Sequence, residues 1–61
     1  MKKYEKIDAQ DLEPEDVIWS DEHEEYKLIK TVTNNLNGDI VVTFDTGETI
    51  FLKPIKKVVL M

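Results

Sequence analysis

The stretch IVVTFDTGETIFL, residues 40–52, decides the fold, because it contains two strand-like segments and the turn between them. Ile40–Phe44 and Thr49–Leu52 show the two-residue alternation of half-buried strands. Gly47 lies in the intervening turn, where it can adopt the positive φ that a type I turn with a G1 bulge requires. The stretch therefore predicts a complete β-hairpin.

The register of this hairpin follows from its apolar side chains. If Phe44 pairs with Glu48, one face carries five large apolar residues, namely Ile40, Val42, Phe44, Ile50 and Leu52. A shift by one residue would bring Thr49, Phe51 and Lys53 to that face, which is a poorer core. A lone hairpin is marginal in water, so we expect further strands to cover the apolar face.

The opposite face of the hairpin holds Val41 and Phe51, which the same register places opposite each other. Two outcomes are open. Coiling of a small barrel would cover Phe51 with the N-terminal turn, or Val41 and Phe51, together with Tyr4, would form an exposed apolar patch. Such a patch marks a contact surface for a partner or for a second copy in a weak homodimer.

The chain has 61 residues, which is enough for one domain spanning residues 1–61. It contains no cysteine, so disulfides and thiolate chemistry are excluded. No apolar run approaches the ~20 residues that span a bilayer, and none resembles the core of a signal peptide. We expect a cytoplasmic protein without a membrane segment.

Charge is distributed unevenly along the chain. The net charge is −5, and all positive charge comes from lysine, so the planar fork of arginine for guanine or phosphate is absent. Residues 1–26 hold ten acids against three lysines, whereas residues 27–61 hold three acids against five lysines. The two parts therefore carry −7 and +2, which makes the folded molecule dipolar.

The rest of the sequence predicts further elements before and after the hairpin. Residues 1–6 form a polar lead-in, unless Tyr4 and Ile7 pair as a short edge strand. Asp8–Leu12 reads as one helical turn with Asp8 as its N-cap. Strands are expected at residues 17–19, 26–33 and 57–61, and the middle one needs a bulge near Ile29 and Lys30 to reconcile its alternation. The turns are expected at residues 34–39, around Asn37-Gly38, and at residues 53–56, as a 3₁₀ turn.

These elements predict an all-β fold, a small five-stranded barrel. The run Asp11–Ile18, DLEPEDVI, resembles the D-L-x-P-G-D-V-I opening of small SH3-like β-barrels. Tyr26-Lys27-Leu28, the F-D-x-G-E-T turn and the terminal K-K-V-V-L are similar to the rest of that pattern. Glu15 replaces the glycine of the pattern, so we expect a type I turn there, since a left-handed glutamate would be strained. The resemblance implies an accessory or phage-type small protein that binds rather than catalyses.

The candidate binding surface is the acidic segment from Glu13 to Glu25, which contains no lysine. Its carboxylates are Glu13, Glu15, Asp16, Asp21, Glu22, Glu24 and Glu25. The functional interpretation is a surface that docks a basic partner protein or imitates the charge of nucleic acid. The alternative is a solvated surface that keeps a small protein in solution.

Catalytic and metal-binding interpretations find little support in the sequence. His23 lies among acids but is accompanied by no nucleophile motif, so we expect an exposed histidine and no enzyme activity. The acidic run lacks the spacing of a calcium loop, and adjacent side chains point apart, so we expect no metal site and no cofactor. Trp19, in a short strand beside Val17, is expected to lie in the core.

Three functions compete. The leading hypothesis is a non-catalytic protein-binding module, a regulator or phage-type inhibitor, whose acidic face meets a basic partner. The second is a nucleic-acid-binding barrel that uses Lys27, Lys30, Lys53, Lys56 and Lys57. Net negative charge disfavours it. The third is an oligomer that holds a small ligand between its subunits.

Overall fold

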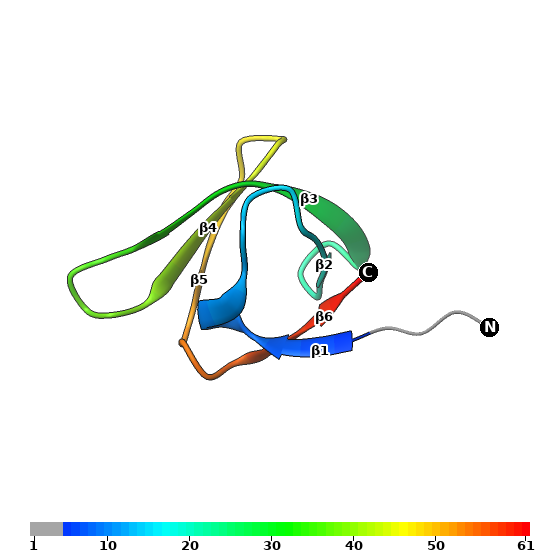
Figure 1. Cartoon of the computed structure of the whole chain (residues 1–61). Coiled ribbons are helices and arrows are strands. Elements are labelled where there is room, and N and C mark those ends of the chain that lie inside the picture. The colour runs from blue at the N-terminus through cyan, green and yellow to red at the C-terminus, as the bar shows by residue number, and fades with distance from the viewer. Residues whose placement is uncertain (1–4) are drawn as a thin grey trace.

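The computed structural model describes residues 5–61, in which six strands form one antiparallel sheet (Figure 1). The elements are β1 (Glu5–Asp8), the 3₁₀ helix η1 (Ala9–Asp11), β2 (Val17–Ser20), β3 (Glu25–Asn34), β4 (Ile40–Phe44), β5 (Thr49–Leu52) and β6 (Lys57–Leu60). Their order across the sheet is β1-β6-β2-β3-β4-β5. The prediction of an all-β chain is confirmed.

The predicted five-stranded closed barrel is wrong in two respects. A sixth strand, β1, pairs with β6 and aligns Ile7 with Val58. Within residues 5–61 the sheet also stays open, with β1 and β5 as its edges. The physical reason is the turn at residues 53–56, where Lys56 N–H donates to the Lys53 carbonyl at 2.9 Å. Pro54 in this turn lacks an N–H, so the chain leaves β5 at an angle and β6 pairs elsewhere (Figure 1).

The hairpin that organises the sequence forms with the predicted register. Val42 pairs with Ile50 and Ile40 with Leu52, while the Phe44 N–H donates to the Glu48 carbonyl at 2.8 Å. Gly47 has a φ of 96°, as its turn requires. Phe44 and Val42 are fully buried, so the inward face of the hairpin contributes directly to the core.

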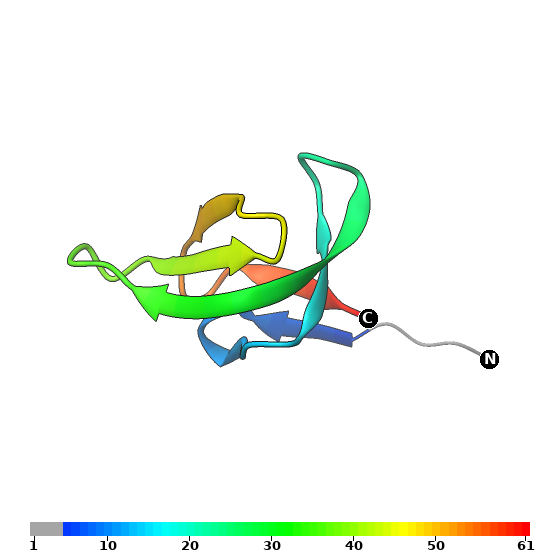
Figure 2. The ribbon, with the colours of Figure 1, turned by 90° about the horizontal axis from the view of Figure 1, so that it is seen from above.

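The long strand β3 holds the two halves of the sheet together, because it pairs with β2 at its start and with β4 at its end. Figure 2 shows β3 as a long, curved strand that crosses the molecule. The expected bulge is confirmed, since the β3–β4 register shifts between Ile29 and Thr31. Before the bulge the buried positions are Lys27 and Ile29, whereas Tyr26 is half-buried and Leu28 is exposed.

A tight turn at Glu13–Asp16 precedes β2, and the expectation of a type I turn there is wrong. Glu15 has a φ of 77°, the left-handed value that the third residue of a type II turn takes. Four hydrogen bonds hold this conformation. Asp16 N–H donates to the Glu13 carbonyl at 3.2 Å, and Glu13 N–H donates to Asp16 Oδ2 at 3.0 Å. Glu15 N–H donates to the Ile29 carbonyl and Ile29 N–H to the Asp16 carbonyl, both at 2.8 Å.

The N-terminal turn forms as η1, but Asp8 makes no side-chain capping bond to it. The Asp8 carboxylate instead accepts a bond from Lys57 Nζ at 2.6 Å. Ala9 N–H donates to the Lys56 carbonyl, so η1 is fastened to the turn before β6. This contact covers one end of the core.

The core contains residues of β2, β3, β4 and β6, together with η1 and the residue that follows it. Its buried apolar members are Ala9, Leu12, Ile18, Ile29, Ile40, Val42, Phe44 and Val58. Trp19 lies outside this cluster, contrary to the expectation, because Ile18 occupies the inward position of β2. It is half-buried on the outer face, where its ring meets that of Tyr26 edge-on at 5.1 Å.

Candidate functional site

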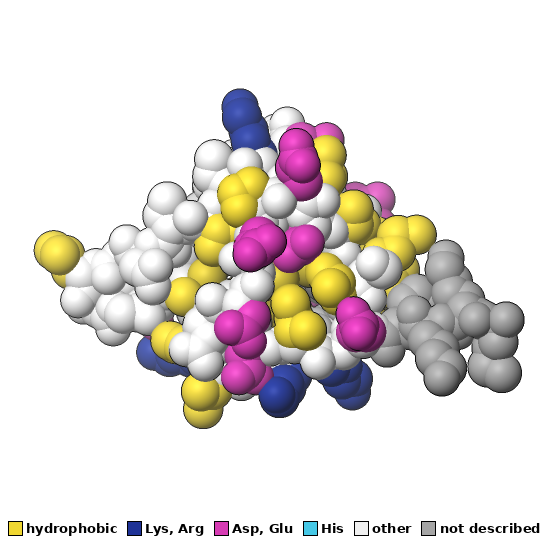
Figure 3. All heavy atoms as spheres, viewed as in Figure 1, with side chains coloured by type: hydrophobic (Ala, Val, Ile, Leu, Met, Phe, Trp, Pro, Cys, Tyr) yellow, Lys and Arg dark blue, Asp and Glu magenta, His cyan; other side chains and the backbone are white. Residues whose placement is uncertain are grey.

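The acidic segment is divided into two turns at opposite ends of β2. One turn contains Glu13, Glu15 and Asp16, and the other lies between Ser20 and Glu25. Because β2 has four residues, the two turns are separated by about 13 Å. In Figure 3, acidic side chains are spread over the visible face with hydrophobic side chains between them, and lysines lie at its margins. The segment is therefore not one continuous acidic patch.

Two of the seven predicted acids have structural partners. Asp16 accepts the Glu13 N–H, and Glu25 Oε2 lies 3.4 Å from Lys27 Nζ. The other five side chains are exposed, namely Glu13, Glu15, Asp21, Glu22 and Glu24. Of these, Asp21 and Glu22 border a groove.

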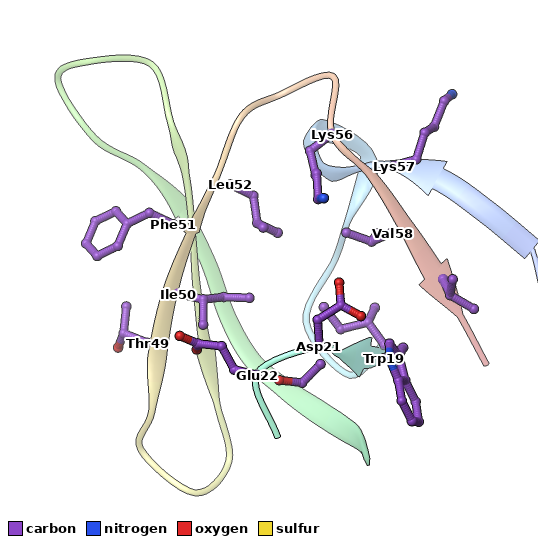
Figure 4. A pocket seen from close by; sticks show the side chains of 13 residues that line it. Trp19, Asp21, Glu22, Thr49, Ile50, Phe51, Leu52, Lys56, Lys57 and Val58 are labelled. Atoms are coloured by element: carbon purple, nitrogen blue, oxygen red, sulfur yellow. The ribbon is translucent and has the colours of Figure 1, made fainter. Parts of the chain in front are cut away.

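The groove has a volume of about 440 Å³ and occupies the open side of the sheet, between β5 and the pair β2 and β6. Its apolar lining includes Ile18, Ile50, Leu52 and Val58. Figure 4 shows Asp21 and Glu22 at one end and Lys56 and Lys57 at the other. The groove is thus apolar along its length and oppositely charged at its two ends.

One wall of the groove is the unpaired edge of β5. In the part of the chain that the structure describes, β5 pairs only with β4. The bond between Phe44 and Glu48 fixes which residues of β5 face β4, because facing alternates along an antiparallel strand. Ile50 and Leu52 turn their backbone groups towards β4. Thr49 and Phe51 therefore turn their N–H and C=O groups outward, along the groove.

The predicted apolar contact pair lies where the register placed it. Val41 pairs with Phe51 across β4 and β5. Phe51 is 62% exposed and Val41 is half-buried, so the N-terminal turn does not cover the ring. Figure 4 shows the Phe51 ring pointing away from the groove. Tyr4, the third expected member of the patch, lies outside the described residues.

A polar network holds the turn that carries Asp21 and Glu22. His23 Nδ1 lies 2.9 Å from Ser20 Oγ, and His23 Nε2 lies 2.6 Å from Glu48 Oε2. His23 is exposed, as expected, but it also has a side-chain partner, because the β4–β5 turn brings Glu48 to it. The only local signal was the three-residue spacing from Ser20 to His23, and no sequence rule connects either residue to Glu48.

Glu48 also binds Lys27, which makes it the centre of the network. Its Oε1 lies 2.7 Å from Lys27 Nζ and accepts a bond from Thr46 Oγ1 at 3.0 Å. The hydrogen bond from Lys27, and then that from Thr46, lowers the pKa of Glu48 below its usual 4.5. The bond to Glu48 in turn raises the pKa of Lys27 above 10.5. Both groups are therefore charged near neutral pH.

The network has the residue types of a nucleophile, a base and a carboxylate, and its contacts connect two turns of the sheet. Ser20 is 4% exposed, so its hydroxyl is enclosed by its neighbours. Ser20, His23 and Glu48 connect the turn at residues 21–24 to the β4–β5 turn. This connection keeps Asp21 and Glu22 beside β5. Among residues 5–61, no group of three or more His, Cys, Asp or Glu is arranged to hold a metal ion.

Comparisons with protein-family models, with curated proteins and with solved structures find no match to this chain. In residues 5–61, no helix has the length and apolar character needed to cross a membrane. The candidate site therefore has to be interpreted from its own geometry.

Proposed function

We propose that this chain is a non-catalytic protein-binding module whose acidic residues meet a basic partner at the groove beside β5. The observation that carries the proposal is the position of Asp21 and Glu22 at the end of a 440 Å³ apolar groove. Specific interfaces combine an apolar centre with a charged rim, and this groove offers both. We also propose that the chain is related to small SH3-like barrels and that it acts as a regulator or phage-type inhibitor.

Electrostatics support a basic partner. The chain carries a net charge of −5, and six carboxylates of the acidic segment are exposed. In residues 5–61 no ion pair forms at Asp21, Glu22 or Glu24, so their charge is available to a partner. Such charges accelerate association and select partners more than they raise affinity.

Three of the six lysines in residues 5–61, by contrast, are paired with carboxylates within the molecule. Lys27 is paired with Glu48, Lys53 Nζ lies 3.3 Å from Asp39 Oδ1, and Lys57 is paired with Asp8. A nucleic-acid interface needs several cations free to replace counterions on phosphates. This pairing favours the acidic side of the molecule over the lysine side as the binding surface.

A second candidate is the binding of a small ligand, alone or between subunits. The groove volume of about 440 Å³ lies within the range of small-molecule sites, about 300–1,000 Å³. Such a ligand would bury itself against Ile50, Leu52 and Val58. A ligand that raises the melting temperature of the isolated chain, and loses this effect in Ile50→Glu, would favour this candidate.

The leading proposal is tested by affinity capture of partner proteins, with the parent chain and two variants as baits. The parent chain is compared with Asp21→Lys/Glu22→Lys/Glu24→Lys, which reverses three exposed acids without breaking an ion pair in residues 5–61. The control is Lys6→Glu/Lys30→Glu, which changes two exposed lysines that likewise have no ion pair in that part of the chain. Proteins that bind the parent and the control but not the reversed variant are purified, and their association rates are measured against salt concentration.

We expect the association rate to fall steeply as the Debye length shrinks from about 10 Å at 0.1 M salt to about 3 Å at 1 M. Equal capture of the same proteins by all three baits would show that the acids are only a solvated surface. The apolar patch formed by Val41 and Phe51 would then be the better candidate.

A further inference from the structure

The open edge of β5 is exposed to pairing by another strand. Its outward backbone groups belong to Thr49 and Phe51, at the wall of the groove. Proteins usually protect such an edge with a proline, a bulge, a charged side chain or a covering segment. The β5 sequence Thr-Ile-Phe-Leu contains none of the first three, and in residues 5–61 no strand covers the edge. The open edge of β5 therefore forms part of the wall of the groove, and the two make a single candidate site.

We infer that an extended segment of a partner protein adds to β5 as a seventh strand and fills the groove with its alternate side chains. In strand addition, backbone hydrogen bonds supply affinity and pockets for alternate residues supply specificity. Thr49 and Phe51 would exchange hydrogen bonds with the incoming backbone. Side chains of the segment that point inward would contact Ile50, Leu52 and Val58.

Charge at the two ends of the groove defines the chemistry of the segment. Asp21 and Glu22 lie near Thr49, whereas Lys56 lies near Leu52 (Figure 4). The segment should carry lysine or arginine at the end beside Asp21 and Glu22, with apolar residues at alternate positions beyond it. This inference rests on the proposed function, because it names the kind of partner that the acidic residues would meet.

A second copy of this chain suits the site less well than a basic segment. Each copy carries a net charge of −5, so two copies repel each other as whole molecules. Like charges brought together at an interface disfavour association. The outward-pointing Phe51 ring gives a partner strand additional apolar contact on the solvent face, where it lies beside Val41.

The test begins with a displayed library of random peptides of about ten residues, long enough for a strand of usual length with short flanks. Peptides selected on the folded chain should show alternating apolar positions and a basic end. The best binder is then synthesised and added to the isotope-labelled protein. We expect slower hydrogen exchange at the amides of Thr49 and Phe51 in the complex, since these groups become hydrogen-bonded.

Two variants at one position separate the backbone from the side chain. Phe51→Pro removes the outward N–H without removing a bond to β4, and should weaken peptide binding about tenfold or more. Phe51→Thr keeps the N–H and loses the ring, and should retain most of the binding. If Phe51→Pro fails to fold, the exchange measurement on the parent chain still decides the question.

The results distinguish this inference from the proposed function. Failure to select any peptide, or unchanged exchange at Thr49 and Phe51 in the complex, overturns strand addition. If Asp21→Asn/Glu22→Gln weakens binding while Phe51→Pro does not, acidic docking stands and strand addition is wrong. If Phe51→Pro abolishes binding while the acidic variant has no effect, strand addition stands without the basic end. Slow exchange at these amides that appears without peptide and with dimer formation would assign the edge to a second copy.

Discussion

Lys27 Nζ lies 2.7 Å from Glu48 Oε1, although the lysine side chain is only 8% exposed. The ammonium group also lies 5.8 Å from the centre of the Phe44 ring, at the edge of the core. A buried ammonium group needs charged or hydrogen-bonding partners in place of the water that it has lost. Glu48 and Glu25 are these partners of Lys27. The pair therefore anchors β3 to the β4–β5 turn.

Neutralising Glu48 should lower the stability of the protein more than neutralising Lys27. Glu48→Gln leaves the enclosed ammonium of Lys27 without its closest carboxylate, so we expect a clear fall in the urea midpoint of unfolding. Lys27→Met leaves Glu48, which is 42% exposed and can be hydrated, so the fall should be smaller. The double variant Lys27→Met/Glu48→Gln should recover part of the stability that Glu48→Gln loses. A larger loss in Lys27→Met than in Glu48→Gln would contradict this account.

Stability should depend on pH through the same ion pair and through Asp8. The bond from Lys57 lowers the pKa of Asp8 below its usual 3.8, and the bond from Lys27 lowers that of Glu48 below 4.5. A lowered carboxyl pKa means that the unfolded chain binds more protons, so this stabilisation is full above about pH 4.5 and is lost as pH falls through the folded values. The raised pKa of Lys27 gives stabilisation that is full below pH 10.5 and is lost above it.

The free energy of unfolding should therefore be constant between about pH 4.5 and pH 10.5 and should decline on either side. Urea denaturation followed by tryptophan fluorescence at a series of pH values measures it, since Trp19 is the single tryptophan. The control is Glu48→Gln, in which the acid decline should be shallower. An acid decline of equal slope in both proteins would assign it to other carboxylates.

Much of the fold could be predicted because its signals are local. The hairpin register depends on five alternating apolar residues and one glycine, and the bulge at Ile29 depends on a visible break in alternation. The number of strands could not be predicted, because pairing of Glu5–Asp8 with β6 depends on a surface that exists only after folding. The open sheet likewise depends on the direction of the chain after Pro54.

The candidate site could be predicted only in part. The acidic residues are visible in sequence, but only the fold separates Asp16 and Glu25, which have structural roles, from Asp21 and Glu22 at the groove. The partner of His23 lies 25 positions further along the chain, at Glu48. The conformation of Glu15 could not be predicted from its residue type, because tertiary hydrogen bonds to Ile29 outweigh the cost of a left-handed residue.

Glu15→Gly should therefore stabilise the protein. A non-glycine residue in the left-handed region costs about 1 kcal/mol, and glycine removes this cost while keeping the backbone bonds to Ile29. Glycine at Glu13 should instead destabilise the protein, because φ there is not positive and the unfolded chain gains freedom. Unfolding midpoints of Glu15→Gly and Glu13→Gly provide the comparison. Equal destabilisation by both would mean that the Glu13–Asp16 turn does not hold Glu15 in the left-handed region in solution.

The last prediction concerns nucleic acid and follows from the paired lysines. Lys27, Lys53 and Lys57 each face a carboxylate, so binding to phosphate would first require these ion pairs to break. With a net charge of −5, we expect duplex DNA to bind no more tightly than about 10⁻⁴ M at physiological salt, the weak limit of non-specific binding. Fluorescence anisotropy with a labelled duplex measures this. Asp8→Asn/Asp39→Asn, which frees Lys57 and Lys53, serves as a positive control and should bind more tightly than the parent. Sub-micromolar binding by the parent chain, with a steep dependence on salt, would reverse the ranking and make the lysine side the functional surface.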